Sequence, residues 1–189
     1  QWALAALKQW GVQFRDTSTH PARAFQRIAE GDNRVVPQLA QIAGDTGAAP
    51  IWRATAMEAL GGVGGGQALQ AATQMLYDDD PMLRASTVRA IEFLPLQQRL
   101  QLLDYLIDDP VTTVRMEVAS SLASVPLEQI PPEQATRLRA LFDEYVSTLQ
   151  QDADMPGVQL QMGIFFVNRG DFAAAEAAYR EALYLNSQL

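Results

Sequence analysis

One pattern occurs three times in this chain, as IWRATAMEAL (51–60), MLRASTVRAI (82–91) and TVRMEVASSL (113–122). In each copy an arginine follows an apolar residue, and the interval from Arg53 to Arg84 equals the interval from Arg84 to Arg115. A fixed period of this kind, filled with helix-forming residues, is typical of stacked helical pairs in which no unit buries its apolar face alone. The sequence therefore predicts an all-α, right-handed solenoid of helical hairpins.

Composition narrows the class of protein. The 189 residues are 48% apolar and 19% charged, and no apolar run is long enough to span a bilayer. The net charge of −8 and the absence of a Lys/Arg cluster argue against nucleic-acid binding, which begins with phosphate neutralisation. Because cysteine is absent, disulfides and thiolate metal sites are excluded. Since the chain starts at Gln1 without a Met or a basic-then-apolar leader, we expect an excised piece of a longer protein; a mature form whose signal has been removed is the alternative.

The ends of the helices can be placed from proline, glycine and capping residues. Pro21 suits the first turn of a helix entered from Thr19 or His20, and Asp80 can cap a helix that begins at Pro81. A third unit opens at Asp109 and Pro110. We expect GGVGGG (61–66) to be a loop between two helices, because glycine costs about 1 kcal/mol against alanine inside a helix.

Two further segments follow the repeats. Residues 133–151 carry apolar residues at helical spacing and predict a longer bridging helix, and residues 154–189 predict a helical hairpin packed on small residues. Gly163 and Ala175 permit a close helix crossing, while Tyr179 fills the space beside them. We therefore divide the chain into an N-terminal docking helix and linker (1–18), helical repeats (19–125), a bridging helix (126–153) and a C-terminal hairpin (154–189).

Both kinds of unit resemble known repeats. The Arg-centred units resemble HEAT repeats, in which an Asp-Pro entry precedes an apolar-Arg pair; the first unit has Ala49 and Pro50 at that entry, and the third has a two-residue insertion. The C-terminal hairpin looks like one tetratricopeptide repeat (TPR), from which it departs at Gln159 and Ser187. The matching positions of that repeat are Gly163, Phe166, Ala175, Tyr179 and Ala182.

The order of the pieces, from QWALAALKQWG (1–11) to RGDFAAAEAAYREAL (169–183), resembles the C-terminal part of bacterial multihaem c-type cytochromes. That resemblance implies that haem c and electron transfer belong to an upstream region outside these residues. It also implies a periplasmic or otherwise extracytoplasmic location in a bacterium. No cofactor is expected within the chain itself.

The repeated arginines have two interpretations. We expect Arg53, Arg84 and Arg115 to form a structural ladder that bonds to carbonyls or acids between neighbouring units, because a residue locked to the repeat usually serves the repeat interface. The alternative is a binding stripe for an acidic partner. Gly163, Ala175 and Tyr179 are likewise assigned to the structure of their hairpin.

The residues expected to bind a partner lie at the two ends of the chain. Trp2 and Trp10 share one stripe of the first predicted helix, which needs a partner surface to cover it. Leu160, Ile164 and Asn168 are candidates for a groove on the first TPR helix because of their position in the resembling repeat. In the alternative interpretation, Leu160 or Ile164 packs on the bridging helix instead.

No convergent set of catalytic residues is apparent. Ser120 and Ser121 have no histidine partner, and His20, the only histidine, is expected to cap the helix at Pro21; a distal haem contact is the alternative. Asp78, Asp79 and Asp80 are typical of a helix entry rather than a calcium loop. We therefore expect a non-catalytic protein-interaction scaffold that binds a protein partner or an upstream haem domain, with possible self-association. The alternatives are a purely structural domain or a general protein-binding solenoid unrelated to haem.

Overall fold

The computed structural model describes residues 20–186, and every regular element in that range is helical. The α-helices are α2 (Pro21–Ala29), α3 (Val36–Gly44), α4 (Pro50–Val63), α5 (Gly65–Met75), α6 (Pro81–Ala90), α7 (Leu96–Leu103), α8 (Thr112–Ser121), α9 (Pro132–Gln150), α10 (Pro156–Arg169) and α11 (Phe172–Asn186). Short 3-10 turns lie between them: η1 (Asn33–Val35), η2 (Ile91–Phe93), η3 (Asp104–Asp108) and η4 (Leu127–Gln129).

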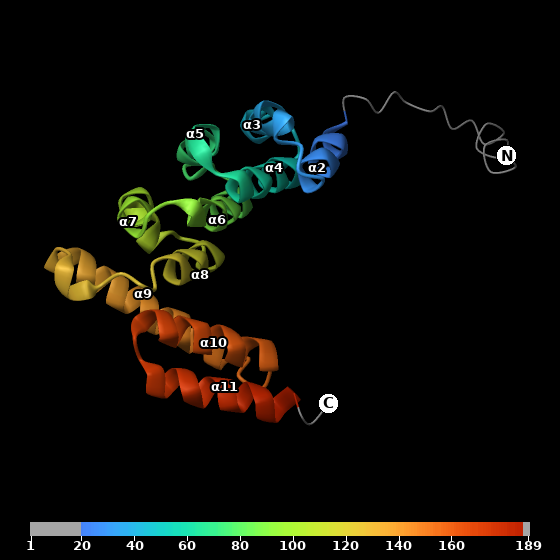
Figure 1. Cartoon of the computed structure of the whole chain (residues 1–189). Helices are drawn as coiled ribbons and strands as arrows, with labels where there is room; N and C mark the ends of the chain where they lie inside the picture. Colours follow the sequence, from blue (N-terminus) through green and yellow to red (C-terminus); the bar gives the residue numbers. More distant parts are fainter. Residues whose placement is uncertain (1–19, 187–189) are drawn as a thin grey trace, which may run out of the picture.

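The helices from α2 to α8 are arranged in two rows (Figure 1). Helices α2, α4, α6 and α8 pack side by side in one row, and α3 and α5 pack in the other, which α7 continues. Helix α9 contacts α8 on one side and α10 on the other, and α10 pairs with α11. Figure 1 shows that α10 and α11 turn back below the repeats, so that the described chain forms an open C with the α2, α4, α6 and α8 row on its inner side.

The predicted helix entries are confirmed at Pro21 and Pro81. The His20 Nδ1 accepts from the Ala22 amide at 3.2 Å ahead of Pro21, and the Asp80 carboxylate accepts from the Met82 amide at 2.8 Å ahead of Pro81. The third unit differs, because α8 begins only at Thr112. There the Asp109 carboxylate accepts from the Val111 amide at 2.9 Å, so the insertion forms a turn before the helix.

The predicted loop over residues 61–66 is wrong in its extent. Helix α4 continues through Gly61 and Gly62, and only Gly64, with φ of 73°, lies between α4 and α5. The reason is tertiary packing. A Cβ on Gly61 would lie 2.3 Å from the carbonyl oxygen of Ala90, so glycine lets the backbones of α4 and α6 touch, and this contact outweighs the low helix propensity of glycine.

A continuous apolar core joins the repeats to α10. It contains fully buried leucines from successive units and ends at Phe142, Tyr145 and Phe165, where the Phe165 ring contacts the other two between α9 and α10. Helix α11 lies outside this core and packs on α10. A Cβ on Gly163 would meet the Tyr179 ring at 2.3 Å, so this glycine sets the close crossing of the final hairpin.

Candidate protein-interaction surfaces

The three repeated arginines lie between neighbouring units, where each bonds to a carbonyl that precedes its own unit and to a carboxylate of the next segment. Arg53 donates from Nε to the Ala43 carbonyl at 3.1 Å, and its Nη2 lies 2.7 Å from the Asp78 carboxylate. Ala43 lies just before the unit that contains Arg53, and Asp78 lies just before the next unit. The Arg53 side chain therefore connects the two ends of its own repeat.

Arg84 and Arg115 repeat this arrangement one and two units further along. Arg84 bonds the Asp109 carboxylate through two nitrogens, at 2.8 and 2.9 Å, and donates to the Asp78 carbonyl at 2.9 Å. Arg115 donates to the Asp109 carbonyl at 2.6 Å and to both carboxylate oxygens of Glu144. The side chain of Asp109 is only 3% exposed. An external acid would have to displace these internal ones, so the geometry offers little to an acidic partner.

The ladder perturbs the ionisation of its members. The hydrogen bonds from Arg115 lower the pKa of Glu144 despite partial burial, and the Asp109 carboxylate raises the pKa of Arg84. Burial works to raise the pKa of Asp78, but the bonds from the Asp80 amide and from Arg53 outweigh it and leave that pKa lowered. All three directions favour the charged forms that the ladder needs.

A second row of ion pairs follows the inner helices. Arg89 of α6 donates to Glu58 of α4 at 2.8 Å and to Glu117 of α8 at 2.6 Å. Burial works to lower the pKa of Arg89, and the hydrogen bonds to the two glutamates raise it further than burial lowers it. The side chains of Glu58 and Arg89 are 48% and 46% exposed, so this row is open to solvent. Our sequence interpretation missed it, although the interval from Glu58 to Arg89 is the same as the interval between the ladder arginines.

Three hollows lie in sequence between the helices of the inner row. The first, of about 550 Å³ between α2 and α4, contains Glu58, as does the second, of about 420 Å³ between α4 and α6. The third, of about 300 Å³ between α6 and the start of α8, shares Arg89 with the second. Because neighbouring hollows share lining residues, we treat them as one feature, the inner furrow.

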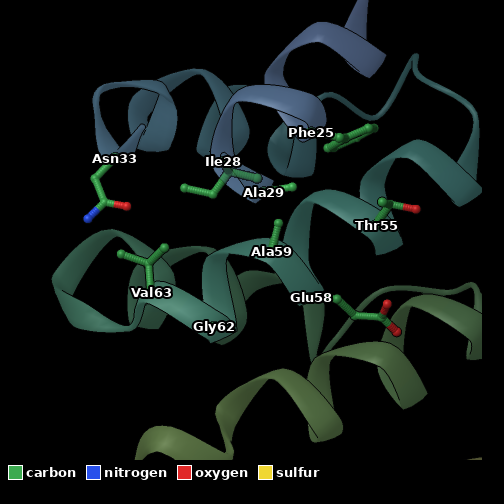
Figure 2. A pocket seen from close by; sticks show the side chains of 9 residues that line it. All are labelled: Phe25, Ile28, Ala29, Asn33, Thr55, Glu58, Ala59, Gly62 and Val63. Carbon is green, nitrogen blue, oxygen red and sulfur yellow. The ribbon is translucent and has the colours of Figure 1, made fainter. Parts of the chain in front are cut away.

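Figure 2 shows the first hollow from close by. Phe25 and Ile28 of α2 line one side, Ala59 of α4 points towards them from the other, and Val63 closes one end. Glu58 lies on the side of α4 that faces α6. The walls are therefore largely apolar, with a carboxylate at the boundary with the next hollow.

The final hairpin carries a second exposed surface. Leu160 and Ile164 are 48% and 57% exposed, and Asn168 is exposed beside them on α10. Phe165 packs on Phe142 of α9, and Gln161 donates to the Tyr145 hydroxyl of the same helix at 2.9 Å. The assignment of Leu160, Ile164 and Asn168 to a partner-binding groove stays a prediction, as does the alternative that packs Leu160 or Ile164 on the bridging helix. Three further exposed apolar residues of the hairpin are Val167, Phe172 and Leu183.

Arg169 fastens this hairpin to the repeats and had no signal in the sequence. From the end of α10 it donates to the carbonyls of Ala123 and Val125, both at 2.8 Å, and its guanidinium lies 4.8 Å from the centre of the Phe142 ring. Burial lowers the pKa of Arg169. The carbonyls belong to the loop after α8, so one side chain ties the last repeat to α10.

The remaining sequence predictions concern the two N-terminal tryptophans, their helix and the single histidine. Trp2, Trp10 and the predicted docking helix lie outside the described residues. His20 caps α2, and its ring packs edge-on against Trp52 at 5.4 Å. Over residues 20–186, no group of three potential metal ligands converges, and no helix is long and apolar enough to cross a membrane.

Comparison with known families agrees with the repeat architecture. A family model for HEAT repeats matches residues 36–123, which is the stretch from the start of α3 to the loop after α8. Comparison with curated proteins and with solved structures gave no match. The described chain is thus an all-α solenoid with a HEAT-like repeat region, and HEAT repeats generally mediate protein–protein interaction.

Proposed function

We propose that this chain is a non-catalytic scaffold that binds a segment of a partner protein in the inner furrow. The observation that carries the proposal is the continuity of the furrow across α2, α4, α6 and α8, where neighbouring hollows share Glu58 and Arg89. A surface built from successive repeats suits a ligand that is itself a chain.

The shape of the furrow favours a polypeptide over a small molecule. Small-molecule sites usually enclose most of their ligand, whereas these hollows lie open to solvent between neighbouring helices of the inner row. Their apolar walls, from Phe25 in the first hollow to Val111 in the third, would be covered by the side chains of a bound segment.

The test is a selection of peptides from a random library on the purified protein. Selected peptides should lose binding to Ala59→Trp, because the indole would fill the first hollow, and should keep binding to Gln70→Trp, which adds the same group to the exposed surface of α5. Circular dichroism checks that both variants are folded. If every selected peptide binds Ala59→Trp as well as the parent protein, the furrow is not the binding site.

A finer proposal is that the parent protein is a multihaem cytochrome of the bacterial periplasm and that its last hairpin is a TPR unit. It is supported by the order of the segments and by the hairpin pattern around Gly163 and Tyr179 alone. An absorption spectrum and a mass of the full-length gene product from its own host test the haem connection. A colourless product of unmodified mass would contradict it.

A second candidate role is structural, and the exposed apolar residues of α10 and α11 favour it. In this role the hairpin packs against another domain or a second copy of the chain. The double variant Leu160→Asp, Ile164→Asp should then lower the sedimentation coefficient of the assembly, whereas Gln70→Asp, Gln101→Asp, on the exposed surfaces of α5 and α7, should not. Identical sedimentation of all three proteins would rule this role out.

A further inference from the structure

The charges beside the inner furrow are unevenly balanced. Arg89 is shared by two carboxylates, Glu58 and Glu117, so the negative charges of this group outnumber the positive one. The other carboxylate of the furrow, Glu92, is paired with Arg99. Because the hydrogen bond from Arg89 reaches only one oxygen of Glu58, its other oxygen can accept a bond from a ligand. The chain as a whole has a charge of −8, which also favours a cationic partner.

The spacing of the hollows restricts the conformation of the ligand. Packed helices lie about 8–10 Å apart. The first two hollows lie at the C-terminal halves of their helices, whereas the third is lined by Pro81, Met82 and Ala85 at the start of α6 and is therefore displaced along the helix axis. A polyproline-II segment rises about 3.1 Å per residue with three residues per turn, so every third side chain points the same way at intervals of about 9 Å. Such a segment can place one apolar side chain in each of the first two hollows.

These two observations together identify the ligand more closely than the proposed function, on which this inference rests. We propose that the inner furrow binds an extended segment in which two apolar side chains three positions apart occupy the first two hollows and a lysine or arginine between them pairs with Glu58. Arg89, which lines the second and third hollows, disfavours a second cation further along the furrow. The furrow would then select for both charge and register.

The probe is a fluorescein-labelled synthetic peptide, LKPLSPL, titrated against the purified protein with all 189 residues. We compare it with LEPLSPL, which reverses the charge, and with LLLKPSP, which keeps the composition but breaks the spacing. LKPLSPL should bind about tenfold more tightly than LEPLSPL, because a partly exposed charge pair is gained in one case and a repulsion in the other. LLLKPSP should bind more weakly than LKPLSPL.

Variants of the protein test whether removing a carboxylate and removing a cation change the affinity in opposite directions. Glu58→Gln should weaken LKPLSPL about threefold, and Arg89→Gln should tighten it about threefold, because the competing cation is removed. Glu176→Gln, which removes an equal charge from exposed α11, should leave the affinity unchanged. Loss of stability cannot mimic this result, because destabilisation would not tighten binding.

The outcomes separate this inference from the function on which it rests. If LKPLSPL and LEPLSPL bind equally, or if Arg89→Gln weakens LKPLSPL, the inference is wrong even when library peptides still lose binding to Ala59→Trp. The same holds if library peptides that depend on the furrow bind but LKPLSPL does not. If no peptide depends on Ala59, the proposed function itself fails.

Discussion

Gly61 and Gly62 are neighbours in α4, but a side chain would have opposite effects at the two positions. A methyl group on Gly61 would lie 2.3 Å from the Ala90 carbonyl oxygen, whereas nothing lies within 4 Å of a Cβ on Gly62. Gly61→Ala should destabilise the fold by about 1–3 kcal/mol through overpacking against backbone. Gly62→Ala should stabilise it by up to about 1 kcal/mol, because alanine favours the helix. Urea unfolding measures both, and similar midpoints would contradict the close α4–α6 contact.

The Arg115–Glu144 pair should make stability depend on pH. Hydrogen bonds from Arg115 lower the pKa of Glu144 below its ordinary value of 4.5 in the folded state, so the pair stabilises the fold fully above that value. The contribution is lost as the pH falls through the lower, folded pKa. The parent protein should therefore be more stable than Glu144→Gln at pH 7, and the difference should shrink below about pH 4.5. Unfolding at pH 7 and pH 3 checks this. An undiminished difference at pH 3 would exclude the ionised pair as its source.

At the scale of elements, the docking of the final hairpin should depend on Arg169. Arg169→Ala removes two charge-assisted bonds to the Ala123 and Val125 carbonyls and the contact with Phe142. We expect a loss of about 1.5–3 kcal/mol, seen as faster amide hydrogen exchange in α10 and α11 with little change in α4 and α6. Arg180→Ala is the control, since the side chain of Arg180 is 78% exposed and pairs with Glu176 of its own helix. Equal effects of the two variants would mean that Arg169 does not hold the hairpin.

Elements that are signalled by local residues were predictable from the sequence, and contacts between elements were not. Asp80 and Pro81 signal a helix start by their own chemistry, and the helix begins there. The extent of α4 through Gly61 could not be predicted, because it depends on Ala90, which belongs to a different helix. The role of Arg169 depends on carbonyls of a loop two helices earlier, and a sequence does not show which backbone carbonyls accept a side chain. The inner furrow was predictable in part. The Glu58–Arg89 interval is visible in the sequence, but the sequence does not show that α4, α6 and α8 pack in one row.

At the scale of the whole molecule, the helices that a core substitution destabilises should depend on its position along the solenoid. Leu39 of α3 and Leu83 of α6 are both fully buried, and either Leu→Ala change should cost about 2–5 kcal/mol locally. Because repeats are stabilised chiefly by their neighbours, Leu39→Ala should raise hydrogen exchange in α2 to α4 and spare α8 to α11. Leu83→Ala should raise it from α4 to α8. A uniform increase through α11 in the Leu39 variant would show that the chain unfolds as a single unit.

The two rows of ion pairs also differ in their response to dissolved salt. The Arg84–Asp109 pair is nearly enclosed, while Arg89 and Glu58 are about half exposed on the inner side of the C. Since the screening length falls from about 10 Å at 0.1 M salt to about 3 Å at 1 M, and buried pairs are screened much less than exposed ones, molar salt should weaken the inner row while the ladder keeps its length. The helices of the inner row would then separate slightly, and the radius of curvature of the repeats would increase. Ionic strength would in this way adjust the width of the furrow without unfolding a single helix.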